Sequence, residues 1–157
     1  MAKAAPVKPK RSLSENGSTM TDRINLDTTQ LANTVDRLRE GLARYNLDTS
    51  DEQIRDGLIQ RFEFAYEASH KMLKRYLKET AASRAAIDRM AFADLIRTAN
   101  EQGIPRGDWL AWRGFRDMRT RTSLAYDGVV AVDIIAGIPD FLDEAAHLCA
   151  ELTARCA

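Results

Sequence analysis

The segment from Arg119 to Asp127 holds several side chains that could bind phosphate groups. It reads Arg119-Thr120-Arg121-Thr122-Ser123-Leu124-Ala125-Tyr126-Asp127. An arginine can bind a phosphate through two parallel N–H donors, and Ser123 and Tyr126 add hydroxyl groups. No histidine or cysteine lies near Ser123 in the sequence to act as its base, so we do not expect a serine nucleophile. The segment favours phosphate binding over covalent catalysis.

More arginines precede this segment, three residues apart beside an aromatic stripe that runs from Trp109 to Met118. Arginines bind phosphates, and aromatic rings stack on bases. The stretch is therefore either a ridge that binds nucleotide or RNA, or an amphipathic helix whose tryptophans are core and whose arginines only cover it. In the first interpretation the contacting residues are Arg113, Arg116, Arg119, Arg121 and Ser123.

Glu63 and Glu67 form a second candidate group, because residues four apart share one face of a helix. Paired carboxylates can serve as acid and base. The alternative is a solvated face with ion pairs such as Glu67 with Lys71. Histidines and cysteines show no metal-ligand spacing, so we expect no metal site and no cofactor. The two cysteines, seven residues apart near the C-terminus, are expected to be free thiols.

The composition indicates one globular domain. The chain has 157 residues, of which 45% are hydrophobic and 29% charged, and its formal net charge is zero. Zero net charge argues against generic, charge-driven binding of nucleic acid, so any such surface must be a local patch. No apolar run is long enough to span a membrane. The N-terminus lacks the apolar region of a secretory signal, so we expect a cytoplasmic protein.

Hydrophobic spacing predicts an all-α, up-and-down bundle of four main helices with a short extra one. Residues 1–24 are rich in Lys, Pro, Ser and Gly and are expected to form a disordered extension. Either Met20 is the natural start or residues 1–19 are dispensable. The helical domain is then 25–157. Its expected helices begin near 27, 51, 90, 107 and 128, with a link at 81–88 and a kink or division of the last helix at Pro139.

Two blocks of the chain resemble HEPN-domain proteins encoded beside minimal nucleotidyltransferases. One block is Gln60 to Glu67 followed by Leu73 to Leu77. The other runs from Trp109-Leu110 through Arg116 to Arg119, Ser123, Tyr126 and Asp127. This family contains nucleotidyltransferase substrate-binding proteins and, in toxic members, HepT toxins. The resemblance extends from about Leu26 to Leu152. It implies a helical-bundle homodimer that associates with a nucleotidyltransferase.

In toxic members of this family an Arg-x4-His-x-Tyr motif forms a ribonuclease site at the dimer interface. The resemblance makes Arg119 the motif arginine and Tyr126 the tyrosine that a partner adenylylates. The histidine position holds Leu124, which cannot exchange a proton near neutral pH. On a continuous helix Arg119 and Leu124 would lie about 140° apart. They would act together only if the helix ends between them or if two chains meet there.

The leading interpretation is a non-catalytic HEPN subunit that binds a nucleotidyltransferase through the region 113–126. The alternative is a ribonuclease toxin that uses Arg119 and is silenced by adenylylation of Tyr126. A third interpretation makes Leu124 an engineered or selected change that renders a toxin expressible.

Overall fold

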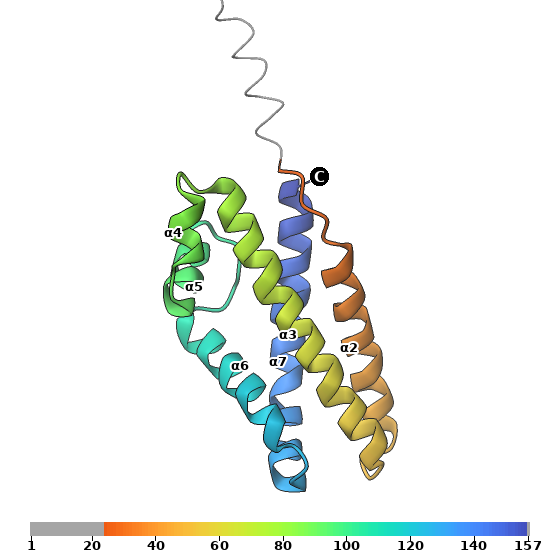
Figure 1. Cartoon of the computed structure of the whole chain (residues 1–157). Coiled ribbons are helices and arrows are strands. Elements are labelled where there is room, and N and C mark those ends of the chain that lie inside the picture. The colour runs from red at the N-terminus through yellow and green to blue at the C-terminus, as the bar shows by residue number, and fades with distance from the viewer. Residues whose placement is uncertain (1–23, 157) are drawn as a thin grey trace, which may run out of the picture.

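The protein is a bundle of antiparallel helices. The structure is a computed structural model that describes residues 24–156 (Figure 1). Its long helices are α2 (Thr29–Leu47), α3 (Glu52–Thr80), α6 (Trp109–Arg121) and α7 (Gly128–Cys156). Two short helices, α4 (Arg84–Asp88) and α5 (Phe92–Glu101), lie between α3 and α6, and a 3-10 turn, η1 (Thr122–Leu124), follows α6. The described residues contain no strand. The predicted all-α bundle is confirmed.

Aspartates begin three of the long helices. The Asp51 carboxylate accepts hydrogen bonds from the backbone of Gln53 and Ile54, and Asp108 and Asp127 cap α6 and α7 in the same way. These carboxylates satisfy amide groups that a first helical turn leaves without partners. At the other end of α5, Gly103 has a φ of 71°, the left-handed conformation that glycine adopts without strain. Gly103 therefore ends that helix, as the sequence indicates.

The structure corrects one local prediction and part of another. The predicted link at 81–88 contains α4, whose first turn is capped by the Ser83 hydroxyl. Of the two outcomes expected at Pro139, a kink or a division, the division is wrong, because α7 runs unbroken from Gly128 to Cys156. Proline removes one backbone donor from a helix interior. Ile135, Ile138, Phe141 and Leu142 are buried around Pro139, and their packing offsets that loss.

An aromatic cluster forms the centre of the core. Phe141 of α7 meets Phe62 and Phe115 edge to face, with ring centroids 5.0 and 5.2 Å apart. Trp112 of α6 is fully buried beside Phe115. The alternative in which the tryptophans of 109–118 belong to the core is therefore correct for Trp112. Because α3, α6 and α7 all contribute rings to this cluster, it sets how α6 lies against the other two helices.

The two ends of the described chain lie at one end of the bundle, and the turn from α6 to α7 lies at the other (Figure 1). Residue 24 and the C-terminus lie at one end, where the Thr28 and Thr153 hydroxyls are 2.8 Å apart (Figure 1). Ile24 and Leu26 pack against the core. Nearly all of the expected extension, 1–24, falls outside the described residues. The turn from α6 to α7 lies at the opposite end of the bundle. Within the described chain no helix combines the length and hydropathy of a membrane span.

Candidate functional site

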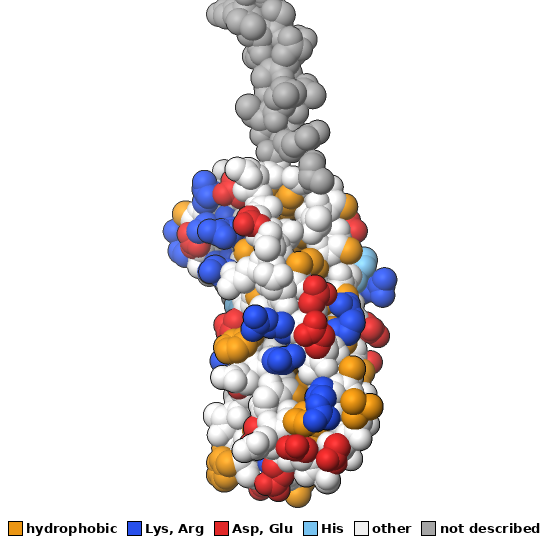
Figure 2. Space-filling view, turned by 90° about the vertical axis from the view of Figure 1, so that its right-hand side faces the viewer, with side chains coloured by type: hydrophobic (Ala, Val, Ile, Leu, Met, Phe, Trp, Pro, Cys, Tyr) orange, Lys and Arg blue, Asp and Glu red, His pale blue; other side chains and the backbone are white. Residues whose placement is uncertain are grey.

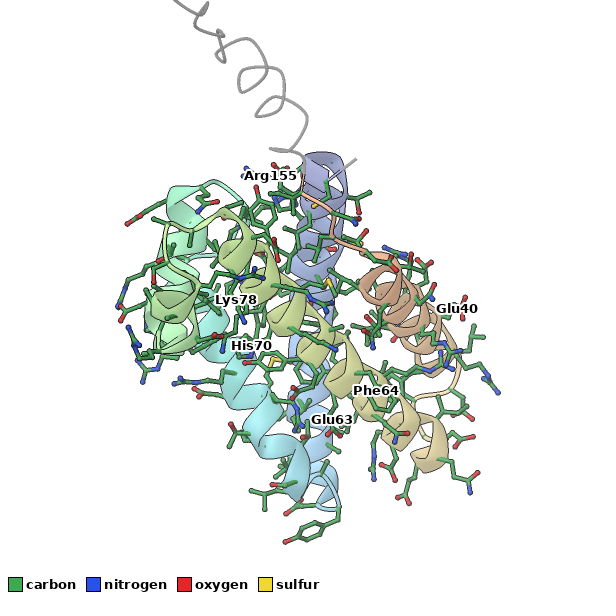
Figure 3. The ribbon with its side chains drawn as sticks, turned by 45° about the horizontal axis from the view of Figure 1, so that its top comes forward. Glu40, Glu63, Phe64, His70, Lys78 and Arg155 are labelled. Atoms are coloured by element: carbon green, nitrogen blue, oxygen red, sulfur yellow. The ribbon has the colours of Figure 1, made fainter. Side chains whose placement is uncertain are left out.

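Arg119, near the end of α6, is bound by two carboxylates of α3. Its Nη1 lies 3.3 Å from Oε2 of Glu63, and its Nε donates to Oε1 of Glu67 over 2.9 Å. Figure 3 shows Glu63 on the part of α3 that faces α6. The two glutamates are partly solvated, 32% and 59% exposed, as one interpretation expected, but the ion-pair partner of Glu67 is Arg119 of α6. They neutralise Arg119, so a phosphate group that binds Arg119 must compete with both.

The helix ends between the motif arginine and position 124. The α-helix stops at Arg121, and Thr122 begins the 3-10 turn. The buried Thr122 hydroxyl accepts from Nη1 of Arg119 at 3.0 Å and donates to the Arg119 carbonyl at 2.7 Å. This change of helix type satisfies within one chain the first of the two conditions for joint action. Leu124 is 48% exposed and offers no proton donor or acceptor.

The other arginines of the predicted ridge differ in the contacts that they make within the chain. Arg121 forms an ion pair with Asp133 of α7. The Arg116 guanidinium lies over the Trp109 ring, 5.0 Å from its centroid, in a cation–π contact. Arg113 is exposed and has no ion pair within residues 24–156. The side chains of α6 therefore do not form a row of free cations, because three of the four arginines of the predicted ridge are held in contacts within the chain.

The hydroxyls of the segment also differ in availability. Ser123 donates to the Thr120 carbonyl over 3.2 Å. Tyr126 is 86% exposed, whereas the other three tyrosines, Tyr45, Tyr66 and Tyr76, are each less than a tenth exposed. Tyr126 is therefore the tyrosine that an external enzyme could reach. Burial raises the pKa of Tyr66 to about 12, a further reason why that phenol is a poor acceptor.

Exposed apolar residues lie at the start of α6 and at the start of α7. Leu110 of α6 and Val129 and Val132 of α7 are 70%, 80% and 55% exposed. A groove of about 440 Å³ lies between the two helices, lined in part by Leu110, Met118 and Gly137. Large apolar side chains grouped on a surface mark sites of protein–protein contact. The face formed by Leu110, Val129 and Val132 with this groove is called the α6–α7 face below.

Glu144 is a structural residue that sequence analysis did not single out. Its acidic neighbours Asp140 and Asp143 on α7 are exposed, but Glu144 is only 6% exposed. Its two oxygens accept from the backbone amides of Arg106 and Gly107 at 2.9 and 2.7 Å. This carboxylate holds the loop that leads into α6. Spacing alone could not identify it, because its partners are backbone groups 37 and 38 residues away in the chain.

His70 is half-buried against Phe92, with ring centroids 4.7 Å apart. Burial lowers its pKa, and the nearby Glu67 opposes that shift. No cluster of three or more His, Cys, Asp or Glu in the described part of the chain is arranged to hold a metal ion. Cys149 and Cys156 are free thiols.

The helical fold and the comparisons with known proteins define a HEPN-like domain of the nucleotidyltransferase substrate-binding class. Residues 26–154 match the family model described as "Nucleotidyltransferase substrate binding protein like", and the chain belongs to this family. It is 37% identical over 145 residues to a protein of Haemophilus influenzae named "Probable ribonuclease HepT", with 87% of this chain and 97% of the relative covered.

A solved structure from the same organism has a matching fold. It is described as revealing the fold of a substrate binding domain of a nucleotidyltransferase. The two chains superimpose with a TM-score of 0.76 at 32% identity, over 81% of this chain and 99% of that chain. The match confirms the helical architecture inferred from the sequence.

Proposed function

We propose that this chain is a HEPN-type subunit that binds a nucleotidyltransferase in the cytoplasm, as one component of a toxin–antitoxin pair, and that it does not cleave RNA. The main support for this proposal is that position 124 holds a leucine. The arginine, the turn after it and the exposed tyrosine are all present, yet the position between them has no group that transfers a proton. Loss of a general acid or base typically lowers a rate by about 10²- to 10⁴-fold.

The α6–α7 face is proposed to hold two copies of the chain together. In a twofold dimer one surface meets itself, so contacts of Val129 and Val132, which follow the turn after Arg119, would bring two such turns close to each other. Analytical ultracentrifugation of Leu110→Glu and Val129→Glu should show monomers where the unmodified chain is a dimer. Leu47→Glu is the matched control, because Leu47 is equally exposed at the end of α2. A monomeric unmodified chain contradicts the dimer.

Tyr126 is the proposed acceptor of AMP from the partner. Its phenolic oxygen would attack the α-phosphate of ATP, the bond to the β-phosphate would break, and pyrophosphate and the phenolic proton would leave. Intact-mass measurement of the chain after incubation with ATP and a minimal nucleotidyltransferase from the same organism should show one added AMP. Tyr126→Phe should remove it, and Ser123→Ala should retain it. The proposed pairing fails if the two proteins neither co-purify nor react.

RNA cleavage is the second candidate function, favoured by the name of the Haemophilus influenzae relative and by the helix end between positions 119 and 124. In that case Leu124→His should raise cleavage of RNA by about 10²-fold or more. Arg119→Ala should abolish it. If the unmodified chain already cleaves RNA and Arg119→Ala removes that activity, the non-catalytic proposal is wrong.

A further inference from the structure

One stripe of α3 remains open to solvent along most of the helix. Gln60, Phe64, Glu67, Lys71 and Arg75 are exposed and follow one another at steps of three or four residues, which places them on one side of the helix. The opposite side of α3 is core. Figure 3 shows the labelled residues Phe64 and Lys78 along this helix. The stripe spans about 22 Å from Gln60 to Arg75 at roughly 1.5 Å per residue, and the partly exposed Lys78 continues the same side of the helix to about 27 Å.

Three adjoining hollows follow this stripe. The largest, about 750 Å³, lies between α2 and α3 and is lined by Phe64, Lys71 and Arg37 among others. A second of about 320 Å³ shares Phe64 and Arg37 with it. A third of about 280 Å³ shares Lys71 and continues to Lys78. Because neighbouring hollows share lining residues, they form one continuous track, called the α3 track below.

The far end of the α3 track is strongly basic. Its cations are Lys71, Lys74, Arg75 and Lys78, and the carboxylate that lines the same hollow is Asp88. Asp88 pairs with Lys78 at 3.0 Å and, more weakly, with Lys74 at 4.0 Å. Lys71 and Arg75 have no ion pair within residues 24–156. Figure 2 shows basic side chains gathered toward the end of the molecule where α3 ends. In a chain with no net charge, this local excess is distinctive.

The near end of the track offers an aromatic ring. Phe64 is 55% exposed although it is a large apolar side chain, and it lies between hollows that also contain Arg37. The Arg61 guanidinium donates to the Arg37 backbone carbonyl over 2.8 Å and so ties α2 to α3 beside Phe64. The walls around the ring are therefore fixed before any ligand binds, which reduces the entropy that binding would cost.

We propose that the α3 track binds single-stranded nucleic acid, with phosphates on the basic end and a base stacked on Phe64. Cations that follow a backbone, together with an aromatic ring that receives a base, are the features of single-strand sites. A duplex fits poorly, because its bases are stacked on one another and offer no face to the ring. The length of the track exceeds the span of a single nucleotide. A strand on the track would pass Glu67, which holds Arg119.

The electrostatic part of the proposal is tested by the salt dependence of binding. The probe is a fluorescein-labelled oligodeoxythymidylate about 12 nucleotides long, which no ribonuclease cleaves, measured by fluorescence anisotropy on the full chain. If the track contacts four phosphates, the logarithm of the association constant should fall with the logarithm of the salt concentration at a slope of about −2.8. The double variant Lys71→Gln/Arg75→Gln removes two of these contacts and should reduce the slope to about −1.4. The matched control is Arg39→Gln/Arg97→Gln, which removes two exposed cations elsewhere and should leave the slope unchanged.

The stacking part is tested at Phe64. Phe64→Leu should weaken binding about tenfold, and Phe64→Trp should restore it, because the indole also stacks on a base. If this exposed ring had only a structural role, Phe64→Leu and Phe64→Trp would not differ in their effect on binding in that way. An oligouridylate probe of the same length shows whether the 2′-hydroxyl contributes.

Three outcomes overturn the proposal. One is no binding at low salt, and another is equal loss of binding in the track and control variants. The third is loss in Arg113→Gln/Arg116→Gln with the track variant unchanged, because the strand would then lie on α6. The site does not depend on the nucleotidyltransferase partner. Absence of AMP transfer therefore leaves it standing, and absence of oligonucleotide binding leaves the partner proposal standing.

Discussion

The ion pairs of Arg119 should make a measurable, salt-sensitive contribution to stability. The perturbation is a double-mutant cycle that combines Arg119→Met with Glu67→Gln and, separately, with Glu63→Gln. Methionine retains most of the arginine stem, so the cycle reports the charge rather than the lost packing. The side chains of Arg119 and Glu63 are one-third exposed and that of Glu67 is 59% exposed. Solvent therefore screens both pairs in part.

The expected size follows from that exposure. Exposed ion pairs contribute about 0.2–1 kcal/mol each. The Glu67 pair has the shorter distance, 2.9 against 3.3 Å, and the Glu63 pair has the lower exposure, so the two couplings should be similar, about 0.5 kcal/mol each. Arg119→Met alone should cost about 1–2 kcal/mol, since it also removes the hydrogen bond to Thr122.

Urea unfolding of the four proteins in each cycle measures these couplings. Between 0.1 M and 1 M salt the Debye length falls from about 10 Å to about 3 Å, so both couplings should shrink. Thr120→Ala, at an exposed neighbouring position, is the control for general disturbance of the end of α6. Couplings indistinguishable from zero at low salt would refute the reasoning. The two carboxylates would then not hold Arg119, and a phosphate group could bind this arginine without displacing them.

The other predictions concern the supports of the site. Glu144→Ala should lower the free energy of unfolding by about 3 kcal/mol, because two buried amides lose a charged acceptor; a thermal unfolding shift no larger than that of Asp143→Ala would contradict this. Gly57→Ala should raise stability by about 1 kcal/mol, since a Cβ there meets nothing within 4 Å. Gly137→Ala should gain less or lose, because its Cβ would lie 2.7 Å from the Met118 sulfur. His70 has a folded-state pKa below its ordinary 6.5, so the unfolded chain binds more protons; stability should fall as the pH drops below about 6.5, and His70→Phe should flatten that part of a pH series.

The helices were predictable because their causes are local. A three- and four-residue apolar spacing places Leu31, Val35 and Leu38 on one buried face, and the structure buries all three. Asp51 and Gly103 act on neighbouring backbone groups, so their roles can be inferred from the adjacent sequence. The continuity of α7 through Pro139 was not predictable, since it depends on the packing of residues around the proline that other helices supply.

The sequence indicated which residues belong to the site, but not which of them contact one another. The sequence singled out Arg119, Glu63 and Glu67, yet no spacing rule connects residues more than 50 positions apart. The partner of Arg119 is decided by how α6 lies against α3, which in turn depends on the aromatic cluster around Phe141. Glu144 could not be singled out from the sequence for the same reason. Its burial follows from where the loop before α6 lies, not from the polarity of its neighbours.

The geometry of the turn gives Leu124 its significance. On an unbroken helix residue 124 would lie on a different side from Arg119, and its identity would say little about proton transfer. The helix instead changes type at Thr122, and the buried Thr122 hydroxyl binds both the backbone and the guanidinium of Arg119. The turn thus holds the Arg119 guanidinium through Thr122, while the side chain at position 124 stays exposed a few residues further along the chain. Substituting histidine there tests chemistry alone, because Leu124 is half exposed and supports little of the core.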